Sequence, residues 1–390
     1  MTGMGFVKNW SGLMAARWFL GLAEAGLFPG ISLYLSCWYK RSELGLRTVS
    51  QYSQGVHCPE KNSLTPLKAF FFSAAAIAGS FGGLLAAAIE NMHGIGNLPG
   101  WAWIFIIEGL LTVVFGFISF WTVYDFPDDP KTTFLSAEDK ARAIHRLQTD
   151  HQSSAAREHF SMVYVYQALR DWKMWLGMII YSGCTMPLYA FSMFLPTIIH
   201  DLGWSTSVVQ TQFYSAPPYV AGALVTIMTG YLSDRFSQRG IYNVGCSIVA
   251  LMGFTLQLAS PVPAVKYAGC FFAAFGIYPC IPNTISWVAN NVEGVYKRGV
   301  VLGFVIGWGN LNGAVSSNIY FSSPHYVEGH AVVIAYLAVF LLGGSLLMMM
   351  LLRSENKIRQ SGGRDIWVEG KTGDEIRNMG DRRPDFIYTI

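Results

Sequence analysis

The sequence predicts an all-α protein that crosses a membrane several times. Of its 390 residues, 52% are apolar and only 13% are charged, whereas a soluble domain carries about 25% charged residues. The apolar residues occur in blocks of about 20, which is the length that a helix needs to span a bilayer. Lys and Arg are concentrated in alternate links between these blocks, a pattern typical of a chain that passes repeatedly through a membrane.

About nine blocks are long enough to be membrane spans. They cover residues 13–38, 69–89, 102–124, 173–199, 214–233, 241–259, 265–289, 300–320 and 331–352. Most Lys and Arg residues follow the first, third, fifth, seventh and ninth of these blocks. Because basic links stay in the cytoplasm, we expect these links and the C-terminus on the cytoplasmic side of the plasma membrane.

An internal repeat indicates how the spans are grouped. Matching residues separated by the same 250 positions are Gly26 and Gly276, Pro29 and Pro279, Glu43 and Glu293, and Arg47 and Lys297. Parallel duplicated halves of six helices build one large class of membrane proteins around a central site, so the first half is expected to lack about three helices. The predicted parts are a partial N-terminal bundle (1–124), a central cytoplasmic loop (125–171), a C-terminal six-helix bundle (172–352) and a cytoplasmic tail (353–390).

The link after Arg47 is longer than the repeat predicts. The matching link in the second half is roughly 20 residues shorter, and the surplus lies at 48–68. Val49-Ser50 can be encoded by a splice-donor sequence and Leu64-Thr65 by a branch-point sequence. We therefore hypothesise that residues 48–68 are a retained, in-frame intron. The alternative is a genuine cytoplasmic loop insertion.

Two opposite charges stand inside the first apolar block. Arg17 and Glu24 are seven residues apart, a spacing that places both on one helix face about 10 Å apart. A charge at bilayer depth costs roughly 2.5–3.5 kcal/mol on insertion scales, so two retained charges indicate that the protein handles a polar solute. Arg17 suits an anion anchor and Glu24 suits proton exchange, and the alternative is a structural ion pair. The two charges favour a membrane transporter.

Further polar and aromatic side chains occur near prolines in the later spans, where interrupted helices turn backbone groups toward a cavity. Aromatic faces suit a planar ring and amides suit a carboxylate, so these residues are candidate substrate ligands. They are Tyr189, Asn283, Trp287, Trp308, Asn310 and Asn312. Glu108 in the third span is a further candidate for binding substrate or proton. The alternative for each residue is ordinary helix packing.

Charged residues at the basic ends of several spans predict a cytoplasmic gate. A carboxylate tied to basic residues near a helix end must separate from them when the inner face opens. The predicted gate residues are Glu43, Arg47, Asp234, Arg235, Arg239, Glu293, Lys297 and Arg298. The alternative is that these charges only set the membrane topology. The eight histidines show no metal-ligand spacing, and no pairing of a nucleophile with a base indicates an enzyme.

Several motifs resemble one family of membrane transporters. The run Arg17-Trp-Phe-Leu-Gly-Leu-Ala-Glu24 resembles the fourth helix of fungal major facilitator transporters of the anion:cation symporter (allantoate permease) family. Gly100-Trp-Ala-Trp-Ile-Phe-Ile-Ile-Glu108 resembles its sixth helix, and Gly230-Tyr-Leu-Ser-Asp234-Arg235 resembles the loop motif between helices eight and nine. Tyr189-Ala-Phe-Ser-Met-Phe-Leu-Pro and Arg383-Pro-Asp-Phe-Ile-Tyr are similar to the nicotinic acid permease branch. The likeness covers nearly the whole chain.

The resemblance implies a major facilitator fold of parallel six-helix repeats and proton-coupled uptake of a small organic anion. Nicotinate is the expected substrate. The alternatives are another carboxylate or ureide, such as allantoate or pantothenate, and a non-transporting remnant or substrate sensor. Arg17 occupies a position that is implicated in proton coupling in the family. We expect the anion and the lipid bilayer as partners, the proton as coupling ion, no nucleic acid, no other cofactor and a monomer.

Overall fold

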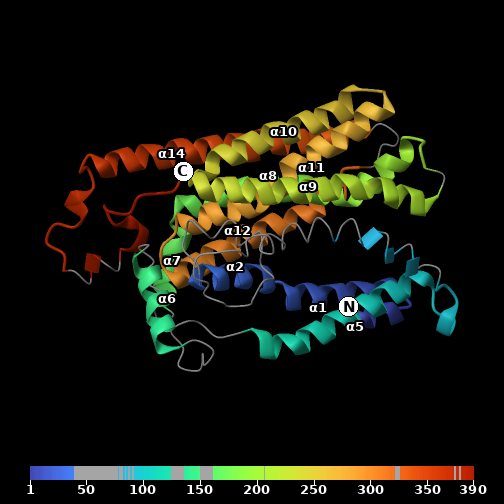
Figure 1. Ribbon diagram of the computed structural model, residues 1–390, viewed down its shortest axis with the longest axis horizontal. Helices are drawn as coiled ribbons and strands as arrows, with labels where there is room; N and C mark the ends of the chain where they lie inside the picture. Colours follow the sequence, from blue (N-terminus) through green and yellow to red (C-terminus); the bar gives the residue numbers. More distant parts are fainter. Residues whose placement is uncertain are drawn as a thin grey trace.

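The structure is a computed structural model that describes residues 1–38, 92–123, 136–149, 161–205, 207–320, 326–372 and 379–390, with isolated residues between 78 and 89 and the pair 375–376. Every regular element in these ranges is a helix. The α-helices are α1 (Trp10–Glu24), α2 (Leu27–Trp38), α5 (Gly100–Thr122), α6 (Ala137–Thr149), α7 (Met162–Leu169), α8 (Trp172–Asp201), α9 (Val208–Phe236), α10 (Arg239–Ala259), α11 (Pro263–Asn290), α12 (Val295–Ser316), α13 (Val327–Ala335) and α14 (Gly344–Gln360) (Figure 1). The π-helical η4 (Tyr336–Gly343) joins α13 to α14, and short 3₁₀ turns form η1 (Thr2–Phe6), η2 (Ile95–Asn97), η5 (Asp365–Trp367) and η6 (Gly380–Arg382).

Six helices in the described ranges are long and apolar enough to cross a membrane, which confirms the predicted all-helical, multi-pass class. They are α5, α8, α10, α11, α12 and the continuous helix Val327–Gln360. The last of these is longer at both ends than the predicted span 331–352. The predicted span 214–233 lies within α9, which begins earlier because the Ser207 side chain caps its first turn by accepting from Gln210 N–H (3.3 Å).

The predicted first span, residues 13–38, is two helices rather than one. Ala25 and Gly26 separate α1 from α2. Pro29 explains the break, because a proline has no N–H donor and its ring clashes with the carbonyl four positions earlier, here that of Ala25. The chain stays close to helical at this point, since Gly30 N–H donates to Gly26 O at 3.0 Å.

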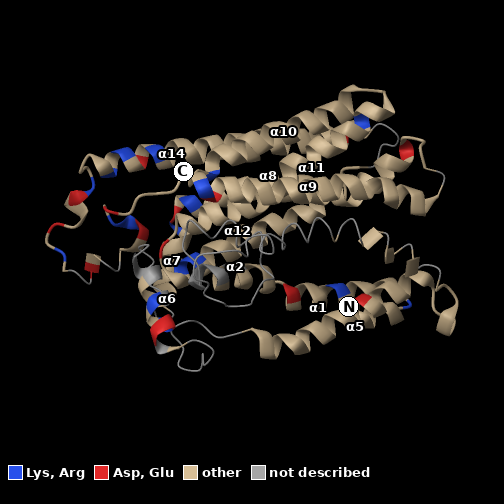
Figure 2. Cartoon of the chain, in the orientation of Figure 1, with Lys and Arg blue, Asp and Glu red and all other residues tan. Residues whose placement is uncertain are grey.

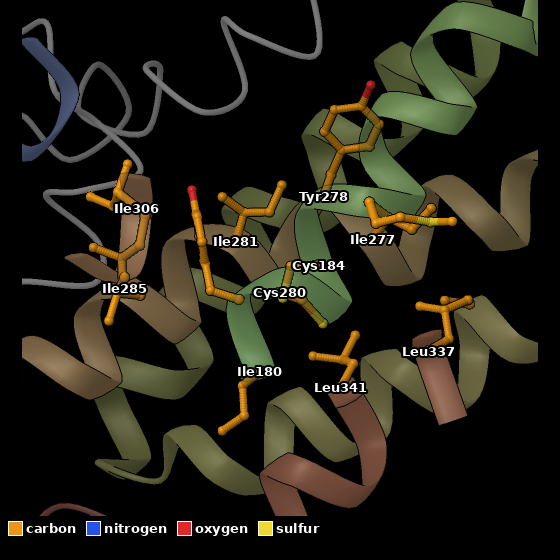
Figure 3. Close-up of a cluster of buried hydrophobic side chains, with 14 of the residues drawn as sticks. Ile180, Cys184, Ile277, Tyr278, Cys280, Ile281, Ile285, Ile306, Leu337 and Leu341 are labelled. Carbon is orange, nitrogen blue, oxygen red and sulfur yellow. The ribbon is translucent and has the colours of Figure 1, made fainter. Parts of the chain in front are cut away.

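Helices α8 to α14 form one packed bundle around a continuous apolar core. Side chains from α8, α11, α12 and η4 meet in its middle (Figure 3). Those at the centre are Ile180, Cys184, Ile277, Cys280, Ile281, Ile285, Ile306, Leu337 and Leu341. The core therefore joins the first and last helices of the predicted C-terminal bundle.

The first-half helices meet this bundle through α2. Leu33 of α2 lies against Gly299, near the start of α12. Helix α1 continues α2 lengthwise and lies next to α5 (Figure 1), and η1 packs on α5 where Thr2 approaches Gly109. Side chains of α1 are largely exposed, as expected for a helix that borders lipid or a cavity between the two halves.

Charged side chains gather at one end of the molecule. Figure 2 shows Lys, Arg, Asp and Glu around α6, α7, the end of α14 and the segment that follows it, whereas the long helices between are mostly uncharged. The predicted tail, 353–390, begins as the last two turns of α14. Its final residues then return to the bundle, so that the C-terminus lies among α8, α10 and α14 (Figure 1).

Gly276 lies at a close contact between two helices of the bundle, and this contact is testable. A methyl group on Gly276 of α11 would overlap the α10 backbone at Cys246 and Ala250. We expect Gly276→Ala to destabilise the bundle by about 1–3 kcal/mol, as overpacking does, and to lower the melting temperature in detergent. Gly245→Ala is the control, because open space surrounds Gly245 on α10. Equal melting temperatures for the two variants would contradict the close contact.

Candidate functional site

A polar pair lies where α8 faces α12. The Tyr189 hydroxyl donates to Asn310 Oδ1 at 2.9 Å. Tyr189 is half-buried and Asn310 is exposed. Two small residues of α12 allow this approach: Gly313 lies beside the Tyr189 ring, and Gly309 O accepts from Thr185 Oγ1 at 2.9 Å. Two of the predicted ligands are therefore in direct contact.

The Tyr189–Asn310 pair faces the first half of the chain. Gly299, which packs against α2, is eleven residues before Asn310, and eleven residues are close to three full turns of an α-helix. Gly299 and Asn310 therefore lie on the same face of α12, about 16 Å apart along the helix. Trp308 is 52% exposed. It is two residues from Asn310, and two residues turn a helix by about 200°, so Trp308 points away from Asn310 on α12.

The Asn312 side chain is bonded within the bundle and is not exposed like that of Asn310. Its side-chain N–H groups donate to Ser182 Oγ on α8 (3.1 Å) and to Gly309 O (3.0 Å). The amide is buried, and in a membrane bundle a buried amide of this kind ties neighbouring helices together. Asn312 thus fixes the distance between the two helices that carry the polar pair.

The structure places Asn283 and Trp287 in a different cluster, between α11 and α10. Asn283 Nδ2 donates to Asn243 Oδ1 (2.7 Å) and to Arg239 O (2.8 Å). The Trp287 indole N–H donates to Thr389 O (3.0 Å) near the C-terminus. Both side chains are buried, so they hold the bundle and the C-terminal segment together and lie apart from the Tyr189–Asn310 pair.

Arg17, Glu24 and Glu108 belong to the neighbouring first-half helices. The Arg17 guanidinium lies 5.5 Å from the centroid of the Phe105 ring on α5. Glu108 is half-buried and follows Phe105 by three residues, which places it on the same side of α5. Arg17 and Glu24 are exposed on α1. Neither carboxylate forms an ion pair with Arg17 within the described ranges, so the geometry does not favour the structural-pair alternative there.

Four of the predicted gate residues, Asp234, Arg239, Glu293 and Lys297, form ion pairs at the charged end. Arg239 at the start of α10 bonds Asp234 at the end of α9, while Arg235 is exposed. Arg298 donates to Val292 O (3.0 Å), and Glu293 is paired with Arg383 (3.2 Å). Glu43, Arg47 and residues 48–68 lie outside the described residues.

A quartet of alternating charges ties α8, α12 and the C-terminal segment together. Lys297 Nζ lies 2.7 Å from both Asp171 Oδ2 and Asp381 Oδ1, and Lys173 Nζ bonds Asp381. Burial alone would raise the pKa of Asp381, but attraction to Lys173 and Lys297 outweighs burial and lowers that pKa well below its ordinary value. All four side chains are buried, and their charges cancel.

Side chains of the bundle hold the remainder of the C-terminal segment through hydrogen bonds to its backbone. The Arg359 guanidinium donates to the carbonyls of Asp381, Arg383 and Phe386. Asn356 and Asn291 each form a reciprocal pair of hydrogen bonds, with the backbone of Tyr388 and of Thr389 respectively. Sequence analysis missed this docking. The available signal was the apolar Phe386-Ile-Tyr388 at the end of an otherwise polar tail, because such residues are normally covered.

Comparison with known proteins identifies a family. Residues 1–317 match the model described as Major Facilitator Superfamily. An uncharacterized transporter of Schizosaccharomyces pombe is 31% identical over 388 residues, covering 99% of this chain and 74% of the relative. Another from the same organism is 32% identical over 338 residues, covering 86% and 62%. The high-affinity nicotinic acid transporter of Saccharomyces cerevisiae is 28% identical over 391 residues, covering 99% and 67%. The chain thus spans 62–74% of the length of these relatives.

A solved structure supports the same fold. A double tryptophan mutant of XylE superposes with a TM-score of 0.50, covering 89% of this chain and 88% of that one. Because the two sequences are only 12% identical, this likeness concerns the helical arrangement alone.

Docking of the C-terminal segment gives a direct prediction. Removing one partner from a buried ion network costs about 3–5 kcal/mol, because the remaining charge is left unpaired. We therefore expect Asp381→Asn to increase hydrogen–deuterium exchange strongly across residues 380–390. Asp365→Asn is the matched control, since Asp365 is an exposed carboxylate of the same tail. If Asp381→Asn exchanges at the parent rate, the charge quartet does not hold the segment.

Proposed function

The chain belongs to the Major Facilitator Superfamily, and from that premise we propose that it is a transporter of a small organic anion that moves together with a proton. Nicotinate is the first candidate substrate. The family is one of membrane transporters, so the chain is not an enzyme. The proposal further places the protein in the plasma membrane as a monomer, with its charged end and C-terminus in the cytoplasm, where basic links remain.

The orientation of the Asn310 amide is the observation that carries the substrate class. The structure places Oδ1 toward the Tyr189 hydroxyl, from which it accepts, and Nδ2 on the other side. In the described part of the chain Nδ2 has no acceptor, so two N–H donors remain for a ligand. A carboxylate oxygen is a natural acceptor for such a donor. The Tyr189 ring beside it offers a face to a planar ring.

Arg17, Glu24 and Glu108 support the coupling to a proton. Two carboxylates and one guanidinium lie on adjacent helices in a region with few other charges (Figure 2). A carboxyl group can carry a proton, and the Arg17 guanidinium can attract a substrate anion. A proton bound at Glu24 or Glu108 would therefore enter together with the anion.

The choice of nicotinate rests on similarity. A relative named as a high-affinity nicotinic acid transporter is 28% identical to the chain, and the Tyr189 and Arg383 motifs resemble the same branch. Nicotinate also combines a planar ring with one carboxylate, as the Tyr189–Asn310 pair requires. Allantoate and pantothenate lack an aromatic ring, so competition for uptake separates these substrates.

Proton coupling predicts a specific loss on removing one carboxylate. In a host that lacks its own permease, the chain should accumulate radiolabelled nicotinate, and Glu24→Gln should reduce accumulation to background because glutamine cannot carry the proton. Glu138→Gln is the control, since Glu138 is an exposed carboxylate on α6 that pairs with Arg142. Surface abundance is measured for each variant. Full accumulation in Glu24→Gln at normal abundance would contradict this role of Glu24.

Substrate binding predicts a separate effect at the polar pair. Asn310→Ala removes a hydrogen bond to a charged group, worth about 1.5–3 kcal/mol, so KM for nicotinate should rise about ten- to a hundredfold. Asn318→Ala serves as the control, because Asn318 is an exposed amide at the end of the same helix that bonds Ala314 O. An unchanged KM in Asn310→Ala would remove this residue from the substrate site.

A further inference from the structure

A polar cavity lies at the charged end of the bundle, far from the Tyr189–Asn310 pair. Its volume is about 410 Å³, and its walls are the start of α8, the end of α14 and tail residues from Arg364 to Lys371 and from Met379 to Arg382. The buried charges Lys173 and Asp381 form its floor. The cavity thus exists only while the C-terminal segment is docked.

The lining of this cavity has an excess of positive charge. Its basic residues are Arg170, Lys173, Arg359, Arg364, Lys371 and Arg382, and its acidic residues are Asp171, Glu355 and Asp381. All three carboxylates already have basic partners, since Lys173 and Lys297 hold Asp171 and Asp381 while Arg359 and Arg364 hold Glu355.

Three cations are left at the rim. Arg170, Lys371 and Arg382 are exposed and form no ion pair with any residue that the structure describes. Arg170 precedes α8 and the other two belong to the tail, so they approach the cavity from two different parts of the chain. An anion with several negative charges would bridge them.

Apolar residues next to the cavity indicate its level relative to a membrane. α7 and the start of α8 expose Met162, Val163, Tyr166, Trp172 and Trp175, and Trp172 also lines the cavity. Exposed tryptophan and tyrosine at the end of a membrane span mark the headgroup layer. The basic cavity therefore opens beside lipid headgroups, on the side that carries most of the positive charge (Figure 2).

We propose that this cavity binds the phosphorylated inositol headgroup of an anionic lipid. Basic pockets at the cytoplasmic ends of membrane helices suit such headgroups. Three rim cations that form no ion pair within the described residues match several phosphate charges, whereas a phosphatidylserine headgroup carries a single net negative charge. Because the headgroup would join Arg170 to Lys371 and Arg382, it would also stabilise the docked C-terminal segment.

The test measures binding of the full chain in phosphatidylcholine nanodiscs, so it does not depend on transport. The three arms are phosphatidylinositol bisphosphate in the bilayer, phosphatidylserine at equal total charge, and soluble inositol trisphosphate. We expect tight binding only in the first arm, with slower hydrogen exchange across residues 380–390. Equal binding of the soluble headgroup would overturn the lipid as the source. Equal binding of phosphatidylserine would overturn the proposal that the cavity recognises the phosphorylated inositol headgroup.

Paired variants separate the cavity from general charge attraction. Lys371→Gln with Arg382→Gln should weaken binding about twenty-five-fold, at about fivefold for each cation removed near a membrane surface. Arg353→Gln with Lys357→Gln is the control, since these exposed cations lie on α14 outside the cavity. The exchanges Lys371→Arg and Arg382→Lys keep the charges and should retain binding. An equal loss in the control pair would overturn the proposal.

Discussion

The buried charge quartet of Asp171, Lys173, Lys297 and Asp381 is the interaction on which the rest of the account depends. It joins the ends of α8 and α12 through a residue of the C-terminal segment. The same two helices carry Tyr189 and Asn310, about 20 Å further along. A change in the distance between their charged ends would therefore also change the distance between Tyr189 and Asn310, because close-packed helices move as stiff units. The quartet and the candidate site are two ends of one structural element.

The polar groups of the bundle divide into two kinds. Hydrocarbon offers no hydrogen-bond partner, so polar side chains inside a membrane bundle bond to one another or face a cavity. Asn283, Asn312 and Arg239 are buried and bonded within the bundle. Asn310 is exposed, and its amide donors are directed away from Tyr189. This contrast, rather than the presence of amides as such, distinguishes the candidate ligand from the residues that hold the helices together.

Hydropathy and motif spacing predicted the helical class, the C-terminal spans and the chemistry of the charged end. Hydropathy and spacing did not predict which polar residues contact one another. Those contacts depend on how each helix is rotated and on the angle at which helices cross, and a sequence repeat gives neither. Asn283 and Trp287 illustrate this, since they share the apolar setting of Tyr189 yet face α10 and Thr389. The break in the first span was foreseeable from Pro29 but was hidden by the uniform hydropathy around it.

The docked C-terminal segment is the largest difference from the sequence prediction. Its polar composition predicted a cytoplasmic tail and did not indicate that the end of the tail packs on the bundle. The long-range pairing of Asp381 with lysines more than 80 positions away leaves no local signal. The segment covers the same helix ends that the predicted gate residues occupy.

The central claim, that the chain carries an organic anion together with a proton, is tested most directly in sealed proteoliposomes that contain only the purified chain. With an inwardly directed proton gradient, the account predicts that labelled nicotinate accumulates above its outside concentration. Collapse of the gradient with a protonophore should release the accumulated label. Equilibration without accumulation, or accumulation that persists after the gradient is collapsed, would contradict the account.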